Sequence, residues 1–376
     1  MDIIATSAFG VESVTARELK QLGYETKTEN GRVIFSGTEA DVARANLWLR
    51  TSDRILIRLA SFEAQSFEEL FQGVYAVEWA DFLPEDAFIH VLGNSVDSTL
   101  HSVPDCQSVA KKAIVEKMKV RYRREVFPEN GTEYKILISI LKDVVTVAVD
   151  TSGAGLHKRG YRVLAGEAPI KETLACAMLL LSFWKGNRTL VDPLCGSGTI
   201  PIEAAMIASD RAPGLKRGFA CESWHTFAPE VFRFARAEAR DRFRPDAETD
   251  ISGSDLDPRA VELAQLHAEA ADMDGLVRIK QMNVRDLSSR KQYGFILTNP
   301  PYAHRLGETR EVEALYRDMG KVFRKLDTWS YSVITPVPNF EKLFGRKADK
   351  RRKLYNGRLE CQLYQFYGPR PPKEEK

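Results

Sequence analysis

The first 155 residues alternate between apolar and polar positions in a way that predicts two small α+β units. Residues 2–6 and 54–60 form short apolar runs typical of strands, whereas residues 11–22 and 41–49 carry the three-to-four-residue apolar spacing of helices. Asn30-Gly31, between residues 26–29 and 32–36, is the dipeptide typical of a type I′ hairpin turn. This order of elements favours a ferredoxin-like unit over residues 1–60.

A second α+β unit is predicted over residues 61–155. Residues 66–73 have helical spacing, residues 87–92 resemble a strand, and residues 107–124 form a long basic amphipathic helix. Residues 134–141 and 144–150 alternate as a hairpin. A basic, glycine-containing link follows over residues 156–168.

From residue 169 onward, strands and helices alternate. The pattern predicts strands at 188–191, 250–254, 277–281, 294–298 and 331–335, and helices at 170–183, 200–207, 258–271 and 311–326. Asn356-Gly357 lies near a final antiparallel pair that ends with residues 358–367. Residues 169–376 are therefore predicted to form a Rossmann-like α/β domain, a doubly wound sheet with a terminal hairpin.

Composition narrows the class of protein. The 376 residues are 44% apolar and 28% charged, which suits two or three ordinary globular domains. The five cysteines are scattered without a CxxC pair, as expected in a reducing cytoplasm. We find no apolar run of membrane-spanning length and no secretory signal, and therefore expect a cytoplasmic protein. The net charge is only +2, so a nucleic-acid partner has to be argued from local basic patches.

A glycine-containing turn is predicted between the strand at 188–191 and the helix at 200–207. It contains Asp192, Cys195, Gly196, Ser197, Gly198 and Thr199. Glycines at such a turn allow backbone N–H groups to approach a ligand closely. Position 201 is proline, so the GxGxxG spacing of a dinucleotide-binding dehydrogenase is missing. The alternative is a structural turn in which Cys195 is a small packed residue.

Two carboxylates follow the next strands. Asp255 lies at the end of the strand at 250–254, where a carboxylate accepts hydrogen bonds from ribose hydroxyls in dinucleotide folds. Asp257 precedes Pro258 and is better explained as a helix N-cap. Asp286 follows the strand at 277–281 and is predicted to accept a hydrogen bond from the adenine of a cofactor; alternatively it is a solvated loop residue.

The most specific motif is Asn299-Pro300-Pro301-Tyr302, which closes the apolar strand at 294–298. A base amino group is a poor nucleophile, and the Asn299 side-chain oxygen with the Pro300 carbonyl would favour its tetrahedral, attacking form. The prolines stiffen the loop so that both acceptors are fixed in advance. Tyr302 offers a flat face for a flipped-out base. The alternative is a proline-rich turn with a packed tyrosine.

These motifs, in this order, are similar to those of class I S-adenosylmethionine-dependent amino-methyltransferases. The segment at 156–175 further resembles the THUMP-containing bacterial 23S rRNA guanine-N2 methyltransferases of the RlmL and YpsC group, a resemblance that covers essentially the whole chain. It implies an N-terminal ferredoxin-like domain (1–60), a THUMP RNA-binding domain (61–155), a linker (156–168) and a methyltransferase domain (169–376) built on a mixed seven-stranded sheet. It also implies that S-adenosylmethionine is the cofactor.

Roles carried over from the family fall on the same motifs. The resemblance implies that Asp255 holds the ribose of the cofactor and Asp286 its adenine, and that Asn299, Pro300, Pro301 and Tyr302 hold the target base. Residues implied to lie near the rest of the cofactor are Asp192, Cys195, Gly196, Ser197, Gly198, Thr199, Lys171, Glu172 and Thr173. The last three are equally well explained as a helix start. Ala303 and His304 replace the usual Gly and Glu of the family, and no metal site is predicted.

Three basic patches are candidate RNA surfaces, because Lys and Arg neutralise phosphates and release counterions. Each patch alone is equally consistent with a solvated face. They comprise Lys111, Lys112, Arg121, Arg123 and Arg124 in the basic helix; Lys158, Arg159 and Arg162 in the linker; and Lys350, Arg351, Arg352 and Lys353 near the C-terminus.

Together with these patches, the resemblance implies an enzyme that methylates guanine N2 in RNA, with 23S rRNA as the expected substrate. Adenine-N6 methylation of DNA or RNA and guanine-N2 methylation of tRNA are alternatives, because the Asn-Pro-Pro-Tyr motif does not distinguish adenine from guanine. An alternative of a different class is a non-catalytic RNA-binding or ribosome-assembly protein.

Overall fold

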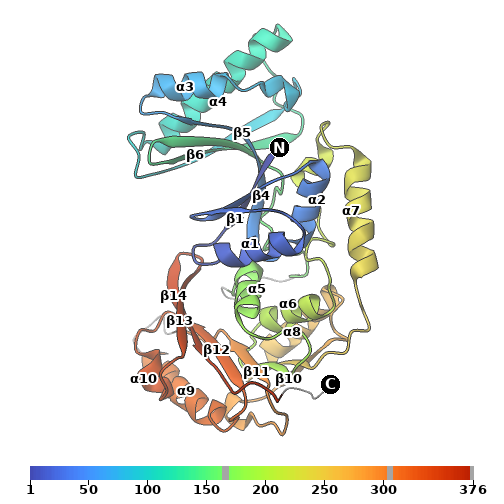
Figure 1. Ribbon diagram of the computed structural model, residues 1–376, viewed down its shortest axis with the longest axis vertical. Coiled ribbons are helices and arrows are strands. Elements are labelled where there is room, and N and C mark those ends of the chain that lie inside the picture. Colours follow the sequence, from blue (N-terminus) through green and yellow to red (C-terminus); the bar gives the residue numbers. More distant parts are fainter. Residues whose placement is uncertain (163–168, 303–307, 373–376) are drawn as a thin grey trace.

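A computed structural model describes residues 1–162, 169–302 and 308–372. Within these residues the chain forms two seven-stranded sheets, placed one after the other along the long axis of the molecule (Figure 1). The first has the order β2-β3-β1-β4-β7-β6-β5 and the second the order β10-β9-β8-β11-β12-β14-β13. The second sheet is the mixed seven-stranded sheet predicted from the sequence.

The first sheet is continuous across the two predicted α+β units. Its strands are β1 (Asp2–Ser7), β2 (Lys27–Glu29), β3 (Arg32–Ser36), β4 (Ser52–Glu63), β5 (Phe88–Val96), β6 (Glu133–Leu141) and β7 (Val144–Asp150). β4 is longer than predicted, because it pairs with β1 through its first half and with β7 along most of its length. The predicted boundary at residue 60 falls inside this strand, so both units share one sheet.

Four helices belong to this first half: α1 (Glu12–Gln21), α2 (Glu39–Trp48), α3 (Phe67–Tyr75) and α4 (Val103–Tyr122), with a short 3-10 turn, η1 (Trp79–Asp81). Ser66 and Glu69 form a capping box at the start of α3. α4 begins with a proline in its first turn and ends at Arg123, which is left-handed at φ 54°. α3 and α4 lie at the end of the molecule remote from the second sheet (Figure 1).

In the second sheet, β8 (Leu190–Asp192), β9 (Ile251–Asp255), β10 (Val277–Gln281), β11 (Phe295–Thr298) and β12 (Ser330–Thr335) are parallel. β14 (Leu359–Phe366) runs antiparallel to β12, and β13 (Lys350–Asn356) pairs antiparallel with β14 at the edge of the sheet. The helices are α5 (Glu172–Leu181), α6 (Thr199–Ala208), α7 (Pro229–Arg242), α8 (Pro258–Ala270), α9 (Glu308–Phe323) and α10 (Phe340–Phe344), with 3-10 turns η2 (Ala220–Ser223) and η3 (Val284–Asp286).

The α7 region was not predicted, and it packs against the first half of the chain. Apolar residues between positions 212 and 239 belong to the same core as the first sheet; the Trp224 ring, for example, stacks on Tyr134 at 4.8 Å. α7 lies beside α2 (Figure 1). In the opposite direction, Val11 and Val14 at the start of α1 join the core of the second half. The two halves therefore exchange core residues.

No helix in the described part of the chain is long and apolar enough to cross a membrane.

Candidate active site at the edge of the second sheet

The four sequence motifs converge on one edge of the second sheet. The register pairs Asp192 of β8 with Gly253 of β9, and Val191 with Ile296 of β11. Because the carboxyl ends of parallel strands meet at the same edge, the loops that follow these three strands lie side by side. β9 flanks β8 on one side and β11 on the other, so the strand order reverses at β8. This is where open α/β sheets form their ligand crevice.

The glycine loop is held by backbone contacts to β9. The Cys195 N–H donates to the Ser254 carbonyl (2.9 Å), and the Gly196 N–H donates to Oδ2 of Asp255 (2.9 Å). Gly198 adopts φ +81°, and a Cβ there would lie 2.9 Å from the Ala264 Cβ. A Cβ on Gly196 would meet no atom within 4 Å. Gly198 is therefore needed for packing against α8, whereas Gly196 faces open space.

The side chain of Cys195 is buried, as expected for a small packed residue. Burial raises the pKa of its thiol well above the ordinary value, so the thiol stays protonated. It therefore contributes its backbone, and not a nucleophile, to the loop.

The carboxylate of Asp255 joins the two loops on either side of it. Oδ2 accepts from the Gly196 N–H, and Oδ1 accepts from the Asp257 N–H at 3.0 Å. Asp257 in turn caps α8, accepting from the Arg259 N–H at 2.9 Å, as predicted. The carboxylate oxygens of Asp255 retain further acceptor capacity, and its side chain is half-buried at the crevice.

Asp286 lies at the end of η3, which follows β10 directly. Asn283 caps this turn by accepting from the Arg285 N–H at 3.0 Å. The Asp286 side chain is exposed, and it lies one strand beyond Asp255 on the same edge, because Gln281 pairs with Asp255.

Asp192 is buried at the end of β8, where its Oδ1 accepts from the Leu194 N–H at 3.2 Å. Burial raises the pKa of this carboxyl to about 7, and the nearby Asp255 carboxylate acts in the same direction. Within the described residues it forms no ion pair, so a ligand bearing a positive charge would stabilise its ionised form.

A chain of polar contacts joins the start of α5 to the glycine loop. Arg162 Nε lies 3.0 Å from Oε1 of Glu172, and its Nη2 donates to Thr199 Oγ1 at 2.8 Å. Glu172 Oε2 is buried with no hydrogen-bond partner, and burial raises the pKa of this carboxyl to about 7. Glu172 is thus a second buried carboxyl that would accept a hydrogen bond from a ligand.

Lys171 and Thr173, the neighbours of Glu172, lie at a separate cavity and not at the glycine loop. Thr173 Oγ1 donates to Oδ1 of Asp53 at 3.0 Å, and both residues line a cavity of about 260 Å³. Lys171 lines the same cavity. The structure thus connects only Glu172 of the three to the glycine loop.

The loop that follows β11 is held in place by a hydrogen bond from α9. Pro300 is buried, and the Tyr316 hydroxyl, which lies 2.9 Å from Thr335 Oγ1, donates to the Pro301 carbonyl at 3.2 Å. Asn299 is half-buried. Tyr316 was not singled out in the sequence, because only the sheet topology brings α9 beneath this loop.

The sequence predicts that Tyr302 offers a flat face to a base, and the structure shows that its hydroxyl is also engaged. Its hydroxyl donates to Oδ1 of Asn299, and the side chain is half-buried near Asn356 and Cys361 of the terminal hairpin. Burial raises the pKa of the phenol far above its ordinary value, so the hydroxyl remains a donor. The bond orients the Asn299 amide. Ala303 and His304 lie outside the described residues.

The linker patch differs from the prediction. Arg159 is only 3% exposed; its Nη1 donates to the Leu156 carbonyl at 2.7 Å and its Nη2 to the Arg50 carbonyl at 2.6 Å. Arg162 is engaged with Glu172 and Thr199. Neither guanidinium is available to phosphates, because each satisfies buried acceptors. Of the three predicted linker residues only Lys158 is exposed.

The other two patches lie in different halves of the molecule: α4 lies at the end remote from the second sheet, and β13 belongs to the second sheet (Figure 1). In α4 and just after it, Lys112, Arg121, Arg123 and Arg124 are exposed, and Lys111 lies 2.8 Å from Glu129. In β13, Lys350, Arg351 and Lys353 are exposed, although Arg351 pairs with Glu341 and Lys353 with Glu360. Arg352 is half-buried and donates to Gln365 at 3.3 Å.

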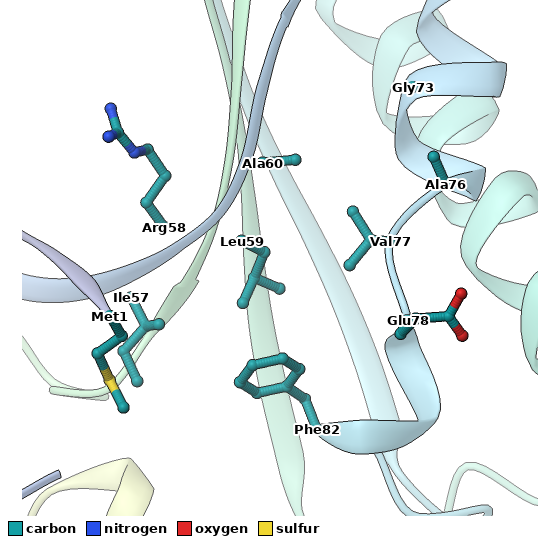
Figure 2. Close-up of a pocket in the computed structure, with 10 residues that line it drawn as sticks. All are labelled: Met1, Ile57, Arg58, Leu59, Ala60, Gly73, Ala76, Val77, Glu78 and Phe82. Carbon is teal, nitrogen blue, oxygen red and sulfur yellow. The ribbon is translucent and has the colours of Figure 1, made fainter. Parts of the chain in front are cut away.

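A cavity of about 360 Å³ lies far from these loops, between β4 and the segment that follows α3. Figure 2 shows Leu59 of β4 facing Val77 and Phe82 across it. Its charged residues are already engaged: Arg58 pairs with Asp2, and Glu78 lies 2.7 Å from Lys117. We assign no chemistry to this cavity.

Comparisons with known proteins agree with this division of the chain. Three family models match in succession: an RlmL ferredoxin-like domain over residues 2–56, a THUMP domain over 64–150 and an RMKL-like methyltransferase domain over 159–365. The chain is 48% identical to YpsC of Bacillus subtilis (strain 168), which is named as a candidate RNA methyltransferase; the match covers 100% of this chain and 98% of YpsC.

Solved structures are similar along the same length. One, from Listeria monocytogenes, is described as a predicted N6-adenine-specific DNA methylase; it is 47% identical, with a TM-score of 0.93 over 98% of this chain and 96% of that chain. Another, SMU.472, is described as a candidate methyltransferase in complex with S-adenosylhomocysteine; it is 47% identical, with a TM-score of 0.92 over 99% of each chain.

Proposed function

The chain belongs to the THUMP-containing, RlmL-like methyltransferases, and on that premise we propose that it transfers a methyl group from S-adenosylmethionine to the exocyclic N2 amino group of a guanine in 23S rRNA. The observation that carries the proposal is the position of Asn299: its loop and the glycine loop follow adjacent parallel strands. A methyl donor above β8 and an amino group at Asn299 would therefore lie in one crevice.

The residues at this edge fit the cofactor. It carries an ammonium group, and Asp192 and Glu172 are buried carboxyls with raised pKa values that a positive charge would satisfy. The open space in front of Gly196 leaves room for its amino-acid end. We propose that residues 196–199 line that end, that Asp255 holds the ribose hydroxyls and that Asp286 holds the adenine amino group. When bound, the cofactor supplies a methyl group on a positively charged sulfur.

The catalytic contribution of the chain is positioning. Asn299 Oδ1 and the Pro300 carbonyl would accept the two amino hydrogens of the base and so favour a nitrogen whose lone pair points at the methyl group. The Tyr316 hydroxyl and the two prolines hold these acceptors in place. Tyr302 is protonated at neutral pH and is therefore no base; the proton released by the methylated nitrogen passes to solvent.

Two features support RNA over DNA as substrate. The THUMP match covers residues 64–150, and the exposed basic residues of α4 lie within it. The name of YpsC gives RNA as its substrate, whereas the description of the Listeria relative gives adenine in DNA. We propose that residues 1–60 and 61–155 present RNA to residues 169–376 in the cytoplasm during rRNA processing. Phosphates would meet Lys112, Arg121, Arg123, Arg124, Lys158, Lys350, Arg351 and Lys353.

The test is methyl transfer from labelled S-adenosylmethionine to undermethylated ribosomal RNA, to tRNA and to duplex DNA. The labelled product is then digested to nucleosides. We expect label only in ribosomal RNA, as N2-methylguanosine. Label in N6-methyladenine would establish the rival reaction suggested by the Listeria relative. Label in tRNA would establish tRNA as the substrate in place of 23S rRNA. Failure to bind S-adenosylmethionine in calorimetry would favour a non-catalytic RNA-binding protein.

A further inference from the structure

A cavity of about 260 Å³ lies where four parts of the chain meet: the loop between β1 and α1, the start of β4, the start of α5 and the tip of the β13–β14 hairpin. It is smaller than the pockets of about 300 Å³ or more that take drug-sized ligands, so it suits a single flat group. The cavity is distinct from the four motifs described above, although Lys171, which the sequence placed near the cofactor, lines it.

Two aromatic rings flank this cavity. Phe9 is 60% exposed, and its ring lies 6.5 Å from that of Tyr355 at an interplanar angle of 66°. The adjacent Gly10 approaches the hairpin so closely that a Cβ would lie 2.6 Å from the Lys353 carbonyl oxygen. This contact fixes the loop against β13. An aromatic side chain held in an exposed position by its backbone is a ready surface for stacking a base.

The polar lining carries one charge of each sign. Asp53 Oδ1 accepts from Thr173, and the hydrogen bonds found among the described residues leave Oδ2 without a donor. Burial and the nearby Lys171 lower the pKa of His157 to about 4, so the imidazole 4.0 Å from Asp53 is neutral. Lys171 forms no ion pair within residues 1–162, 169–302 and 308–372. The cavity therefore offers an acceptor for an amino group and an ammonium for a phosphate.

The cavity adjoins the candidate active site on two sides. Tyr355 is followed by Asn356, which lies next to Tyr302. Lys171 and Thr173 flank Glu172, which is linked through Arg162 to Thr199 of the glycine loop. A nucleotide bound in the cavity would thus be a near neighbour of a base held at Asn299.

We propose that this cavity binds one unpaired nucleotide of the RNA adjacent to the modified one. Its base stacks on the exposed ring of Phe9, which Tyr355 supports edge-on, its amino group donates to Asp53 Oδ2, and its phosphate meets Lys171. Adenine, cytosine and guanine carry such an amino group and uracil does not, so the site discriminates against uracil. The inference rests on the proposed function in taking RNA as the substrate.

The test uses the full chain saturated with S-adenosylhomocysteine and fluorescently labelled pentanucleotides of adenosine, cytidine or uridine. We expect the adenosine and cytidine pentamers to bind about tenfold more tightly than the uridine pentamer. Joint substitution of Phe9→Ala and Tyr355→Ala is expected to weaken binding of the adenosine pentamer by about tenfold or more. Asp53→Asn, which keeps the shape and the acceptor for Thr173, is expected to abolish the preference over uridine.

The matched control is Phe234→Ala on α7, because Phe234 is 65% exposed and α7 contributes no residue to the lining of the cavity; it should bind all pentamers like the wild type. Calorimetry should give one affinity for S-adenosylhomocysteine across all variants. Equal binding of the adenosine pentamer by the wild type and the double aromatic variant would overturn the proposal, as would equal binding of all pentamers by the wild type.

Steady-state kinetics separates this inference from the proposed function. If RNA is methylated, the double aromatic variant should raise KM for RNA and leave kcat unchanged, whereas an unchanged KM would overturn the nucleotide site and leave the function standing. If no RNA is methylated but the pentamers bind as expected, the proposed function fails and the nucleotide site stands.

Discussion

The guanidinium of Arg159 lies 3.5 Å from the carboxylate of Glu203, with only 2% and 0% of the two side chains exposed. The same carboxylate accepts from the Tyr161 hydroxyl at 3.2 Å and from the Cys176 thiol at 2.9 Å. Arg159 also donates to the Arg50 carbonyl, so this buried pair connects α6 of the second half with the end of α2 in the first.

We expect Arg159→Met to lower the free energy of unfolding by about 3–5 kcal/mol, because it leaves Glu203 buried without its partner. Replacing both residues, Arg159→Met with Glu203→Gln, should recover part of that loss. Denaturant unfolding measures both values. Arg278→Met is the control, since Arg278 pairs with Asp250 at the surface and should change stability little. If Arg159→Met were as stable as the wild type, the structural role of the Arg159–Glu203 pair would be contradicted.

Asn299→Ala is expected to reduce kcat by about 100- to 1000-fold, the usual effect of removing one fixed polar group from a reacting centre. The fold should persist, because the side chain is half-buried and its partner Tyr302 lies in the same loop. Single-turnover methyl transfer measures the rate, and circular dichroism checks the fold. Tyr302→Phe is the companion variant: it keeps the ring but frees the amide, so it should lower kcat less than Asn299→Ala does.

Binding of S-adenosylhomocysteine is expected to strengthen as the pH rises toward about 7, the pKa of Asp192. Below that pH the carboxyl is protonated and does not attract the ammonium group of the ligand. Above about 8 the ligand amine itself loses its charge, so affinity should fall again. Calorimetry from below about pH 7 to above about pH 8 gives the profile. Asp192→Asn should weaken the lower limb without abolishing it, because the Glu172 carboxyl, whose pKa is also about 7, still contributes to it. Asp286→Asn should weaken binding without changing the shape of the profile.

The same group makes a prediction for stability. The pKa of Asp192 is 3.8 in an ordinary environment and about 7 in the fold, so the native state binds more protons than the unfolded state between these values. Its contribution to stability is present at low pH and is lost as the pH rises from about 4 to about 7. Asp192→Asn should therefore raise the melting temperature of the free protein at pH values of about 8. A lowered melting temperature would contradict this assignment.

The two loop glycines are expected to respond differently to alanine. Gly198→Ala should destabilise the fold, because the added methyl lies 2.9 Å from Ala264 and φ is +81°. Gly196 also has a positive φ, +50°, but an added methyl meets no atom within 4 Å; Gly196→Ala should therefore cost less stability than Gly198→Ala but should reduce the affinity for S-adenosylhomocysteine strongly. Thermal unfolding and calorimetry separate the two effects. Equal losses of stability would contradict the distinction.

The sequence was most informative where chemistry and periodicity coincide. The strands that lead to Asp192, Asp255 and Asn299 end at the predicted position or one residue beyond it, because each apolar run stops at a residue that the crevice needs to be polar. Asp257 as a helix cap and Cys195 as a packed residue were also predictable, since a local pattern determines both. The match to ferredoxin-like, THUMP and methyltransferase models confirms the predicted fold class.

The sequence was least informative where distant segments meet. α7 was missed because its apolar stripe (Phe232, Ala235, Ala239) is narrow among charged residues. The basic segment around Arg159 predicts an RNA-facing surface residue, because nothing in it reveals the buried Glu203. Tyr316 and Phe9 gain their positions only from topology. A single sequence records which residues are polar, and not which buried partner each one has.

The exchange of core residues between the two halves has a practical consequence. Cutting the chain near residue 155 would strip Phe219, Trp224 and Phe232 from the first sheet and Val11 and Val14 from the second. Each fragment would expose an apolar surface to water and tend to aggregate. Neither half can therefore be transferred by itself: fusing the N-terminal part to another enzyme would require including the segment 212–239.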